Sequence, residues 1–346
     1  MTNPCKTNHS GCVTKWLLFC CGMIAVMALL GAVTRLTQSG LSITDWKPIV
    51  GAIPPLNDAD WYKSFASYQQ IPQYQILNRG MTLDEFKGIF FWEWVHRLWG
   101  RLIGIVFALP LIVFIAQKKI SRALAIKLAL ILALGALQAF IGWFMVQSGL
   151  EVRTSVSPFR LALHLGFALL LYALVLDTAL QRIFIATRFV NTSLRRHGWI
   201  AIGFLSMTII WGAFVAGLRA GEVYNTWPSM EGGLMPEASW TLDPLWRNAF
   251  ENLGLVQFIH RWIGPTTMIV LLSWVWRCWQ SARDEDKKWL GGLAVMALAQ
   301  VMLGITTLLS HVDIFIATCH QAGAIALLTL VLINLRRVSG TQTLSK

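Results

Sequence analysis

The sequence predicts an all-α integral membrane protein in which eight transmembrane helices form two pseudo-symmetric four-helix bundles. Three observations predict this fold: a composition typical of lipid-embedded chains, eight long apolar stretches, and a second half that repeats residues of the first. Of the 346 residues, 55% are hydrophobic and 13% are charged. The mean hydropathy of +0.57 is far above that of a water-soluble domain.

The net charge of +12 does not indicate a nucleic-acid-binding protein. The lysines and arginines fall in short clusters between apolar stretches and do not line one face of a domain. A distribution of this kind is typical of membrane topology.

The apolar stretches predict the eight helices, because a helix needs about 20 apolar residues to cross a bilayer. The first stretch follows Lys6 and Lys15, but it is too long for a signal-peptide core and lacks a small-residue cleavage site, so we expect it to be retained. The predicted spans are residues 16–36, 90–116, 128–147, 161–181, 200–218, 254–276, 290–310 and 315–335.

Eight spans place both ends of the chain on one side of the membrane. More than half of the 29 lysines and arginines lie in the two tails and in the connections 117–127, 181–198 and 277–288. The positive-inside rule makes these segments cytoplasmic. The other side carries two long loops, 37–89 and 219–253, whose Trp, Pro and Gly content predicts folded caps near the lipid interface.

The second half of the sequence repeats residues of the first half in the same order, which predicts a bundle in residues 1–190 and another in residues 191–346. Because the order is kept, we expect parallel repeats related by an axis along the membrane normal. Gly31, Gly40 and Trp46 recur as Gly212, Gly221 and Trp227 at an offset of 181 residues, His96 and Arg97 as His260 and Arg261 at 164, Gln138 and Gly142 as Gln300 and Gly304 at 162, and His164 as His320 at 156.

Four of the seven histidines lie in predicted spans, and they are the four that the repeat matches. His96 and His260 open the second helix of each bundle, and His164 and His320 open the fourth, each roughly 5–10 Å inside its span. Two imidazoles facing each other across a bundle are what six-coordinate haem iron requires. A lone intramembrane histidine more often hydrogen-bonds a neighbouring helix, but two symmetric pairs favour haem.

Arg97 and Arg261 each follow the first histidine of a pair. An arginine at this depth is costly unless it meets an anion, which haem propionates would supply, or reaches the headgroups by snorkelling. Arg101 has no counterpart, because position 265 is proline.

Glu93 is the most informative difference between the two halves, since its counterpart is Gln257. At three residues before His96, it lies on the same helix face as that imidazole. Only the first bundle therefore puts an acid beside its iron site, where it suits proton transfer or stabilisation of a developing cation. The alternative is an ion pair with Arg97 or Arg101. Gln138 and Gln300 are predicted to join neighbouring helices rather than to bind metal.

Over nearly its whole length the sequence resembles the haem A synthase family. The most specific matching segments are Glu93-Trp94-Val95-His96-Arg97, Ala162-Leu163-His164, Phe258-Ile259-His260-Arg261 and Cys319-His320-Gln321, preceded by Gly31-Ala32-Val33-Thr34-Arg35 and Ser39-Gly40-Leu41-Ser42. The resemblance implies an oxidoreductase that converts a ring methyl of haem O to a formyl group through hydroxylated intermediates, giving haem A for cytochrome oxidase.

The resemblance also implies a division of labour between the bundles. The first bundle would hold the substrate haem, with His96 and His164 at its iron, Arg97 binding it and Glu93 catalytic. The second would hold a haem b cofactor, with His260 and His320 as iron ligands and Arg261 binding it. The implied partners are a haem O synthase that supplies substrate and an unidentified electron-transfer partner, and the sequence leaves open whether the chain forms a homo-oligomer.

Some family members carry a cysteine pair in the long loops, whereas residues 37–89 and 219–253 contain no cysteine. The sequence therefore resembles the branch typical of proteobacteria and mitochondria, and no thiol relay is proposed. Because the N-terminus lacks an Arg-rich amphipathic presequence, we expect a bacterial plasma membrane rather than a mitochondrial inner membrane.

Two other functions use part of the same pattern. A non-enzymatic di-haem b cytochrome that takes electrons from quinol needs the four histidines but has no need of Glu93. A transporter explains the repeat, but its helices are expected to be broken near mid-membrane, whereas the polar residues here cluster towards one face.

Overall fold

The computed structural model describes residues 5–46, 50–184 and 192–338. Within these residues eight helices are long and apolar enough to cross a membrane, and no β-strand occurs, which confirms the predicted fold class. The helices are α1 (Cys5–Leu36), α4 (Leu83–Ala116), α5 (Arg122–Leu150), α6 (Pro158–Ile183), α7 (Thr192–Leu218), α9 (Leu253–Trp279), α10 (Asp284–Leu309) and α11 (Ile314–Val338).

Every one of these helices extends beyond its predicted span at one end or both, because hydropathy marks only the apolar part of a helix. The start of α4 shows the cause. Thr82 and Glu85 form a capping box: the Thr82 hydroxyl accepts from the Glu85 N–H at 3.3 Å, and the Thr82 N–H donates to Glu85 Oε2 at 2.7 Å. This cap starts the helix seven residues before its predicted first residue.

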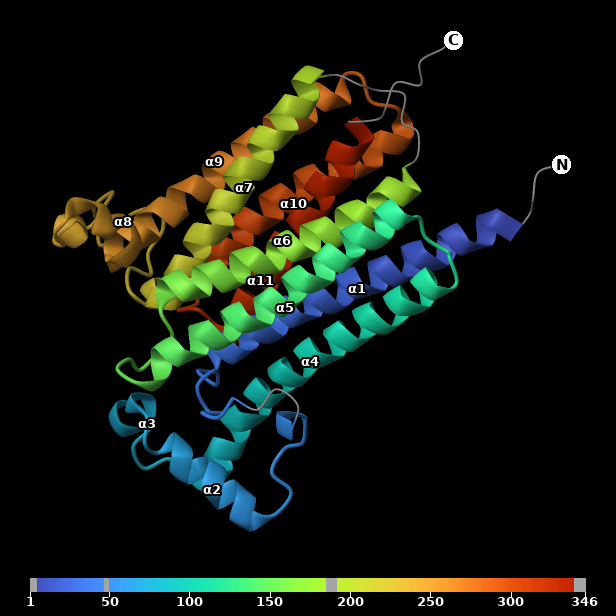
Figure 1. Ribbon diagram of the computed structural model, residues 1–346. Coiled ribbons are helices and arrows are strands. Elements are labelled where there is room, and N and C mark those ends of the chain that lie inside the picture. Colours follow the sequence, from blue (N-terminus) through green and yellow to red (C-terminus); the bar gives the residue numbers. More distant parts are fainter. Residues whose placement is uncertain (1–4, 47–49, 185–191, 339–346) are drawn as a thin grey trace, which may run out of the picture. The chain divides into compact units, whose positions relative to one another are not determined.

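Contacts divide the chain into two compact units. One unit is Gly22–Leu171, and the other contains the start of α1 up to Cys21 together with the described chain from Tyr172 onwards. In the latter, α7 packs against α9, α10 packs against both α9 and α11, and α11 packs against α7 (Figure 1). The predicted boundary between residues 190 and 191 lies outside the described residues.

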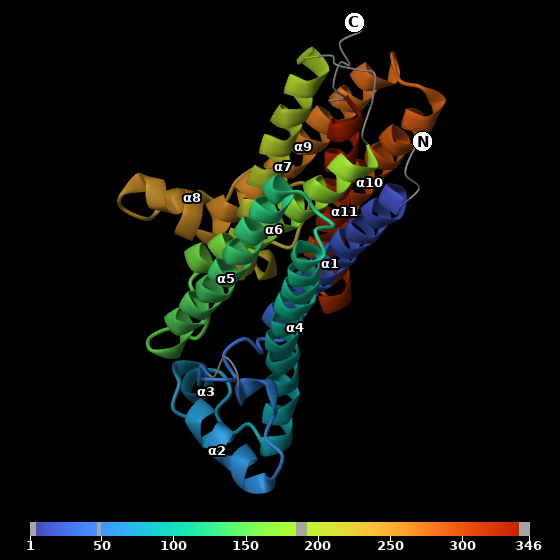
Figure 2. The same ribbon diagram turned by 45° about the vertical axis from the view of Figure 1, so that its right-hand side comes forward.

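The first long loop is folded, as predicted. It contains a short 3-10 helix (η1, Val50–Ala52), α2 (Asp58–Tyr68) and α3 (Pro72–Ile76), which lie beside the N-terminal part of α4 (Figure 2). Phe65 and Tyr68 of α2 pack on Phe86 of α4, with ring centres 5.0 and 5.3 Å away. The early turns of α4 therefore belong to the core of this cap.

The second long loop is also folded, but with less regular structure. It contains η2 (Ala220–Glu222), η3 (Glu237–Trp240), η4 (Leu245–Arg247) and α8 (Asn248–Glu251). The buried Asn248 side chain organises it by accepting from the Leu242 N–H at 2.9 Å and donating to the carbonyls of Leu242 and Leu245. Aromatic packing contributes here too, since Phe250 of α8 lies 5.6 Å from Trp211 and 5.3 Å from Phe214 between ring centres.

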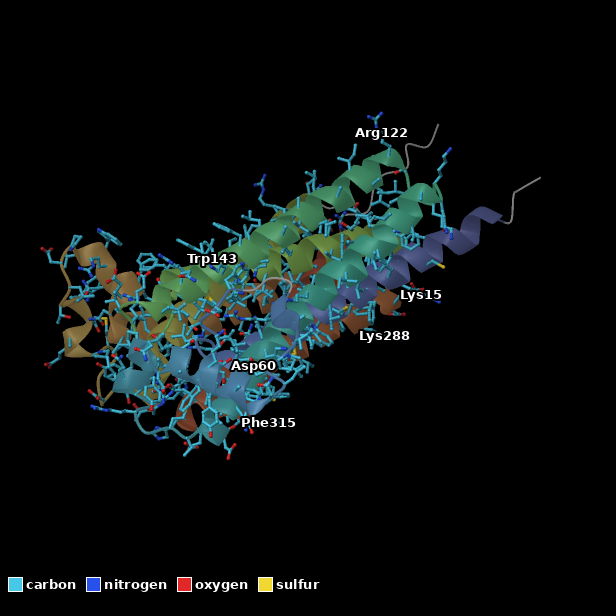
Figure 3. The ribbon with its side chains drawn as sticks, turned by 60° about the horizontal axis from the view of Figure 1, so that its bottom comes forward. Lys15, Asp60, Arg122, Trp143, Lys288 and Phe315 are labelled. Atoms are coloured by element: carbon cyan, nitrogen blue, oxygen red, sulfur yellow. The ribbon has the colours of Figure 1, made fainter. Side chains whose placement is uncertain are left out.

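Figure 3 shows how the helices alternate in direction within each unit. Lys288, near the start of α10, and Phe315, near the start of α11, lie at opposite ends of that unit. In the other unit, Asp60 of the cap and Arg122 at the start of α5 lie at opposite ends (Figure 3). Successive helices therefore run antiparallel.

This arrangement predicts the outcome of cysteine labelling. Asp60→Cys and Lys118→Cys place exposed thiols at the two ends of one unit, in a background where the exposed Cys12 is replaced by serine. A membrane-impermeant maleimide should label residue 60 from one face of the membrane and residue 118 only from the other. Labelling of both residues from the same face would contradict the eight-span topology.

Candidate functional site

The four repeat-matched histidines lie on four different helices, two in each unit. His96 (α4) and His164 (α6) belong to the unit Gly22–Leu171, and His260 (α9) and His320 (α11) belong to the other. All four imidazoles are half-buried. Each unit therefore contains one complete pair.

Three of these histidines lie six or seven residues after the first residue of their helices, about 9–10 Å along the axis, as predicted. His96 differs, because it lies thirteen residues, about 20 Å, after the start of α4. The difference arises from the cap, into which the first turns of α4 extend.

The rings of His260 and His320 have the spacing that a shared iron requires. Their centres are 6.4 Å apart and their planes are inclined at 83°. Metal–imidazole bonds are about 2 Å long and the ring centre lies about 1 Å beyond the nitrogen, so two ligands of one iron have ring centres about 6 Å apart. In the first pair, His96 and His164 lie close enough to interact electrostatically.

Each of the four histidines packs edge-on against a glycine of a neighbouring helix. A Cβ atom built on that glycine would lie only 2.9–3.2 Å from the imidazole Cε1 atom. Any side chain at these positions would therefore turn or displace the ring. The pairs are Gly31 with His96, Gly142 with His164, Gly212 with His260, and Gly304 with His320.

The two repeat-matched glutamines join helices, as predicted. The Gln138 amide on α5 donates to the main-chain carbonyl of His164 on α6 at 2.9 Å, and the Gln300 amide on α10 donates to that of His320 on α11 at 3.0 Å. The first contact includes the ring as well, since Gln138 Nε2 lies 3.1 Å from His164 Nδ1. Each glutamine therefore fixes the helix that carries a histidine.

Glu93 is 2% exposed and is held by three donors. Its Oε2 accepts from the Ser42 hydroxyl at 2.7 Å and from the Ile43 N–H at 2.8 Å, and its Oε1 pairs with Arg97 Nη2 at 2.6 Å. The structure thus contains the ion pair that was the alternative reading of this acid. Because all three partners donate, the site suits an ionised carboxylate, which only accepts hydrogen bonds.

Arg97 also ties the loop before α4 to that helix. It donates to the carbonyls of Ile43 at 2.7 Å and Asp45 at 3.2 Å, and its guanidinium lies 5.9 Å from the ring centre of Trp46. The guanidinium therefore makes most of its contacts with protein groups, and little of it is left to reach towards the lipid headgroups.

The other unit repeats this arrangement at equivalent positions. Arg261 donates to Gln257 Oε1 at 3.1 Å and to the Tyr224 carbonyl at 3.0 Å, and it lies 5.5 Å from the ring centre of Trp227. Tyr224 and Trp227 are the counterparts of Ile43 and Trp46 at the offset of 181 residues. Arg261 also donates to the carbonyls of Pro228 and Ser229.

The acid site has no equivalent in that unit, for two reasons. Position 257 is an amide whose Nε2 donates to the Ala220 carbonyl at 2.9 Å, and the counterpart of Ser42 is Val223, which has no hydroxyl to donate. The first unit thus offers donors to a carboxylate, whereas the second offers an acceptor to an amide.

Sequence reasoning missed two kinds of residue in these sites. Ser42 belongs to the segment Ser39-Gly40-Leu41-Ser42, but no local pattern predicts its contact with Glu93, which spans 51 positions. Gly31, Gly142 and their counterparts were recognised as repeat-matched but received no role. The available signal was the repeat itself, which keeps a glycine at each of these positions in both halves, together with the histidine that it contacts.

The histidine pairs fit a haem better than a metal ion bound by protein alone. Within the described residues no group of three or more His, Cys, Asp or Glu side chains could hold a metal, whereas haem supplies four nitrogens of its own and needs only axial ligands. In the same residues the buried Nδ1 atoms of His96, His260 and His320 have no hydrogen-bond partner. Unpartnered imidazoles in apolar helices favour binding of a ligand.

Comparison with known proteins yields a consistent picture. The model of the COX15-CtaA family, described as cytochrome oxidase assembly protein, matches residues 14–332. A heme A synthase of Rhodospirillum centenum is 53% identical over 334 residues, which cover 96% of this chain and 89% of that protein. Heme A synthases of Nitrosomonas eutropha and Parvibaculum lavamentivorans are 45% and 41% identical, covering 94% and 96% of this chain and 94% and 95% of theirs.

The glycine contacts predict a selective effect of a single methyl group. Gly212→Ala should disturb His260 and weaken haem retention about ten-fold or more, the scale seen when a group that orients a metal ligand is lost. Gly203→Ala on the same helix is the control, because nothing lies within 4 Å of that glycine. Optical titration of the purified variants with haem measures the effect, and equal retention by both would contradict it.

Proposed function

The chain belongs to the cytochrome oxidase assembly protein family, and from that premise we propose that it is a haem A synthase. It is a multi-pass membrane oxidoreductase that converts a ring methyl of haem O to the formyl group of haem A. The observation that carries this assignment is the pairing of two similar histidine sites with a single buried acid, Glu93, in only one of them.

The first bundle, within residues 1–190, holds the substrate. His96 and His164 flank its iron, since both lie in one unit and each is oriented by a glycine of a neighbouring helix. Arg97 contributes to substrate binding through its charge. It also contributes indirectly, because it fixes the loop that carries Ser42 and Ile43. These contacts hold the substrate ring and the acid in one rigid frame, which is how an enzyme lowers the entropic part of its barrier.

Glu93 acts on the substrate as a carboxylate. Its two oxygens are fixed by Ser42, Ile43 and Arg97, so the negative charge needs no reorganisation when positive charge develops on the methyl carbon that is oxidised. A preorganised charge of this kind is a large source of catalysis in a site of low dielectric. The Ser42 hydroxyl offers a route by which a proton reaches or leaves the acid.

The second bundle, within residues 191–346, binds a haem b cofactor. The ring spacing of His260 and His320 and their unpartnered Nδ1 atoms support these two residues as the ones that would hold the haem b iron. Arg261 retains one buried donor, Nε, without a partner among the described residues, and this donor suits a haem propionate. When bound, haem b supplies a one-electron carrier for electrons withdrawn from the substrate.

The setting follows from the fold and from the relatives. We place the enzyme in a bacterial plasma membrane with both termini cytoplasmic, since the reported relatives are bacterial and the Lys- and Arg-rich connections lie on the side of the termini. A haem O synthase is the partner that would supply substrate, and a separate electron-transfer partner would accept the electrons. A di-haem cytochrome is the weaker candidate, because it gives Glu93 and its three donors no role.

The assignment predicts a chemical defect in Glu93→Gln. This change keeps the side-chain volume and leaves both histidines in place, so haem O should still bind while turnover falls about 10²-fold, the scale for losing a positioned acid–base group. Glu85→Gln, at an exposed acid on the same helix, is the matched control and should retain turnover. Haem extracts analysed by chromatography should show haem O or a hydroxylated intermediate accumulating, and normal haem A from Glu93→Gln would refute the catalytic role.

A further inference from the structure

The two glutamines that contact the histidine-bearing helices treat the rings differently. Gln300 donates only to the main-chain carbonyl of His320, and the buried Nδ1 of that ring has no partner among the described residues. Gln138 donates to the carbonyl of His164 and also lies 3.1 Å from its Nδ1. His164 is thus the one repeat-matched histidine whose Nδ1 is engaged by a neighbour in the described part of the chain.

This contact fixes the position of the imidazole proton. An amide nitrogen can only donate hydrogen bonds, so Nδ1 of His164 must accept. A neutral imidazole that accepts at Nδ1 carries its proton on Nε2. Because Nδ1 faces Gln138, Nε2 is the nitrogen left for the substrate, and it presents a hydrogen in place of the lone pair that iron needs.

The second pair lacks this contact. The rings of His260 and His320 have their centres 6.4 Å apart, the spacing of two ligands on one iron, and the buried Nδ1 of each ring has no hydrogen-bond partner among the described residues. Nδ1 of His96 has no partner in those residues, so its Nε2 is free to carry the lone pair.

We propose that His96 is the only protein ligand of the substrate iron and that His164 faces the opposite side of the ring as a hydrogen-bond donor. This inference rests on the proposed function, because it concerns haem O in the first bundle. Gln138 is the positioning residue that holds His164 in the donor state. The substrate iron then keeps its sixth position open for a small ligand, which the Nε2 hydrogen of His164 stabilises.

The test uses the purified full-length protein carrying haem b and loaded with ferric haem O, without a reductant. Electron paramagnetic resonance should show one low-spin haem, from haem b, and one high-spin haem, from haem O. Added cyanide should convert the haem O signal to low spin. His164→Ala should leave the haem O high-spin and weaken cyanide binding about ten-fold, the usual scale for one hydrogen bond.

The glutamines provide a matched pair of variants. Gln138→Leu frees Nδ1 of His164 to carry the proton, so part of the haem O should become six-coordinate and low-spin. Gln300→Leu should leave the low-spin haem b unchanged, because the Gln300 side-chain amide donates to the main-chain carbonyl of His320 and not to its ring. The haem b signal reports folding of the unit with His260 and His320, and retained binding of haem O reports folding of the unit Gly22–Leu171 in the Gln138 and His164 variants.

Low-spin haem O in the wild-type protein overturns the proposal, whatever the His164 variant does. Cyanide affinity unchanged by His164→Ala overturns the donor role. Conversion of haem O to haem A by the wild-type protein is measured separately. If the protein makes no haem A, the proposed function is wrong; if it makes haem A but the spectra differ from those expected, the role assigned to His164 is wrong.

Discussion

In each half of the molecule, the arginine that follows the first histidine binds main-chain carbonyls of the loop before its helix. Arg97 reaches Ile43 and Asp45, and Arg261 reaches Tyr224. A guanidinium inside an apolar helix is costly unless its donors find partners, and here a folded cap accepts most of them. The same bonds fix the cap against the helix, so the position of each histidine relative to its loop depends on this one contact.

On this shared frame, a few substitutions produce two chemically different sites. Where the first half has Glu93 and Ser42, the second has Gln257 and Val223. In the first half the Ser42 hydroxyl donates to the Glu93 carboxylate. In the second half the Gln257 amide donates to a main-chain carbonyl. Neither change alters the helices or their packing glycines. The two halves therefore share one frame and differ in the charge and hydrogen-bonding groups at this position.

Apolar runs of bilayer length were sufficient to predict the eight helices, which the structure confirms, whereas the pseudo-symmetry of two bundles, inferred from the repeat, stays a prediction. The sequence also singled out Glu93 and the four histidines as candidate site residues, since ionisable residues in apolar spans are rare. It could not locate the glycine beside each ring or the Ser42 contact, because these depend on helix packing and loop folding between residues distant in the chain. The extended start of α4 was missed because its cap is polar and hydropathy does not register it.

The central claim is that one chain holds two different haems, a substrate in the first bundle and a cofactor in the second. The most direct measurement is the haem composition of the purified wild-type protein, obtained by extraction, chromatography and quantitation against protein concentration. We expect haem b together with haem O, haem A or a hydroxylated intermediate. A His96→Ala variant should keep haem b and lose the haem O, haem A or intermediate. Haem b alone, at two per chain, would contradict the account and identify a di-haem cytochrome.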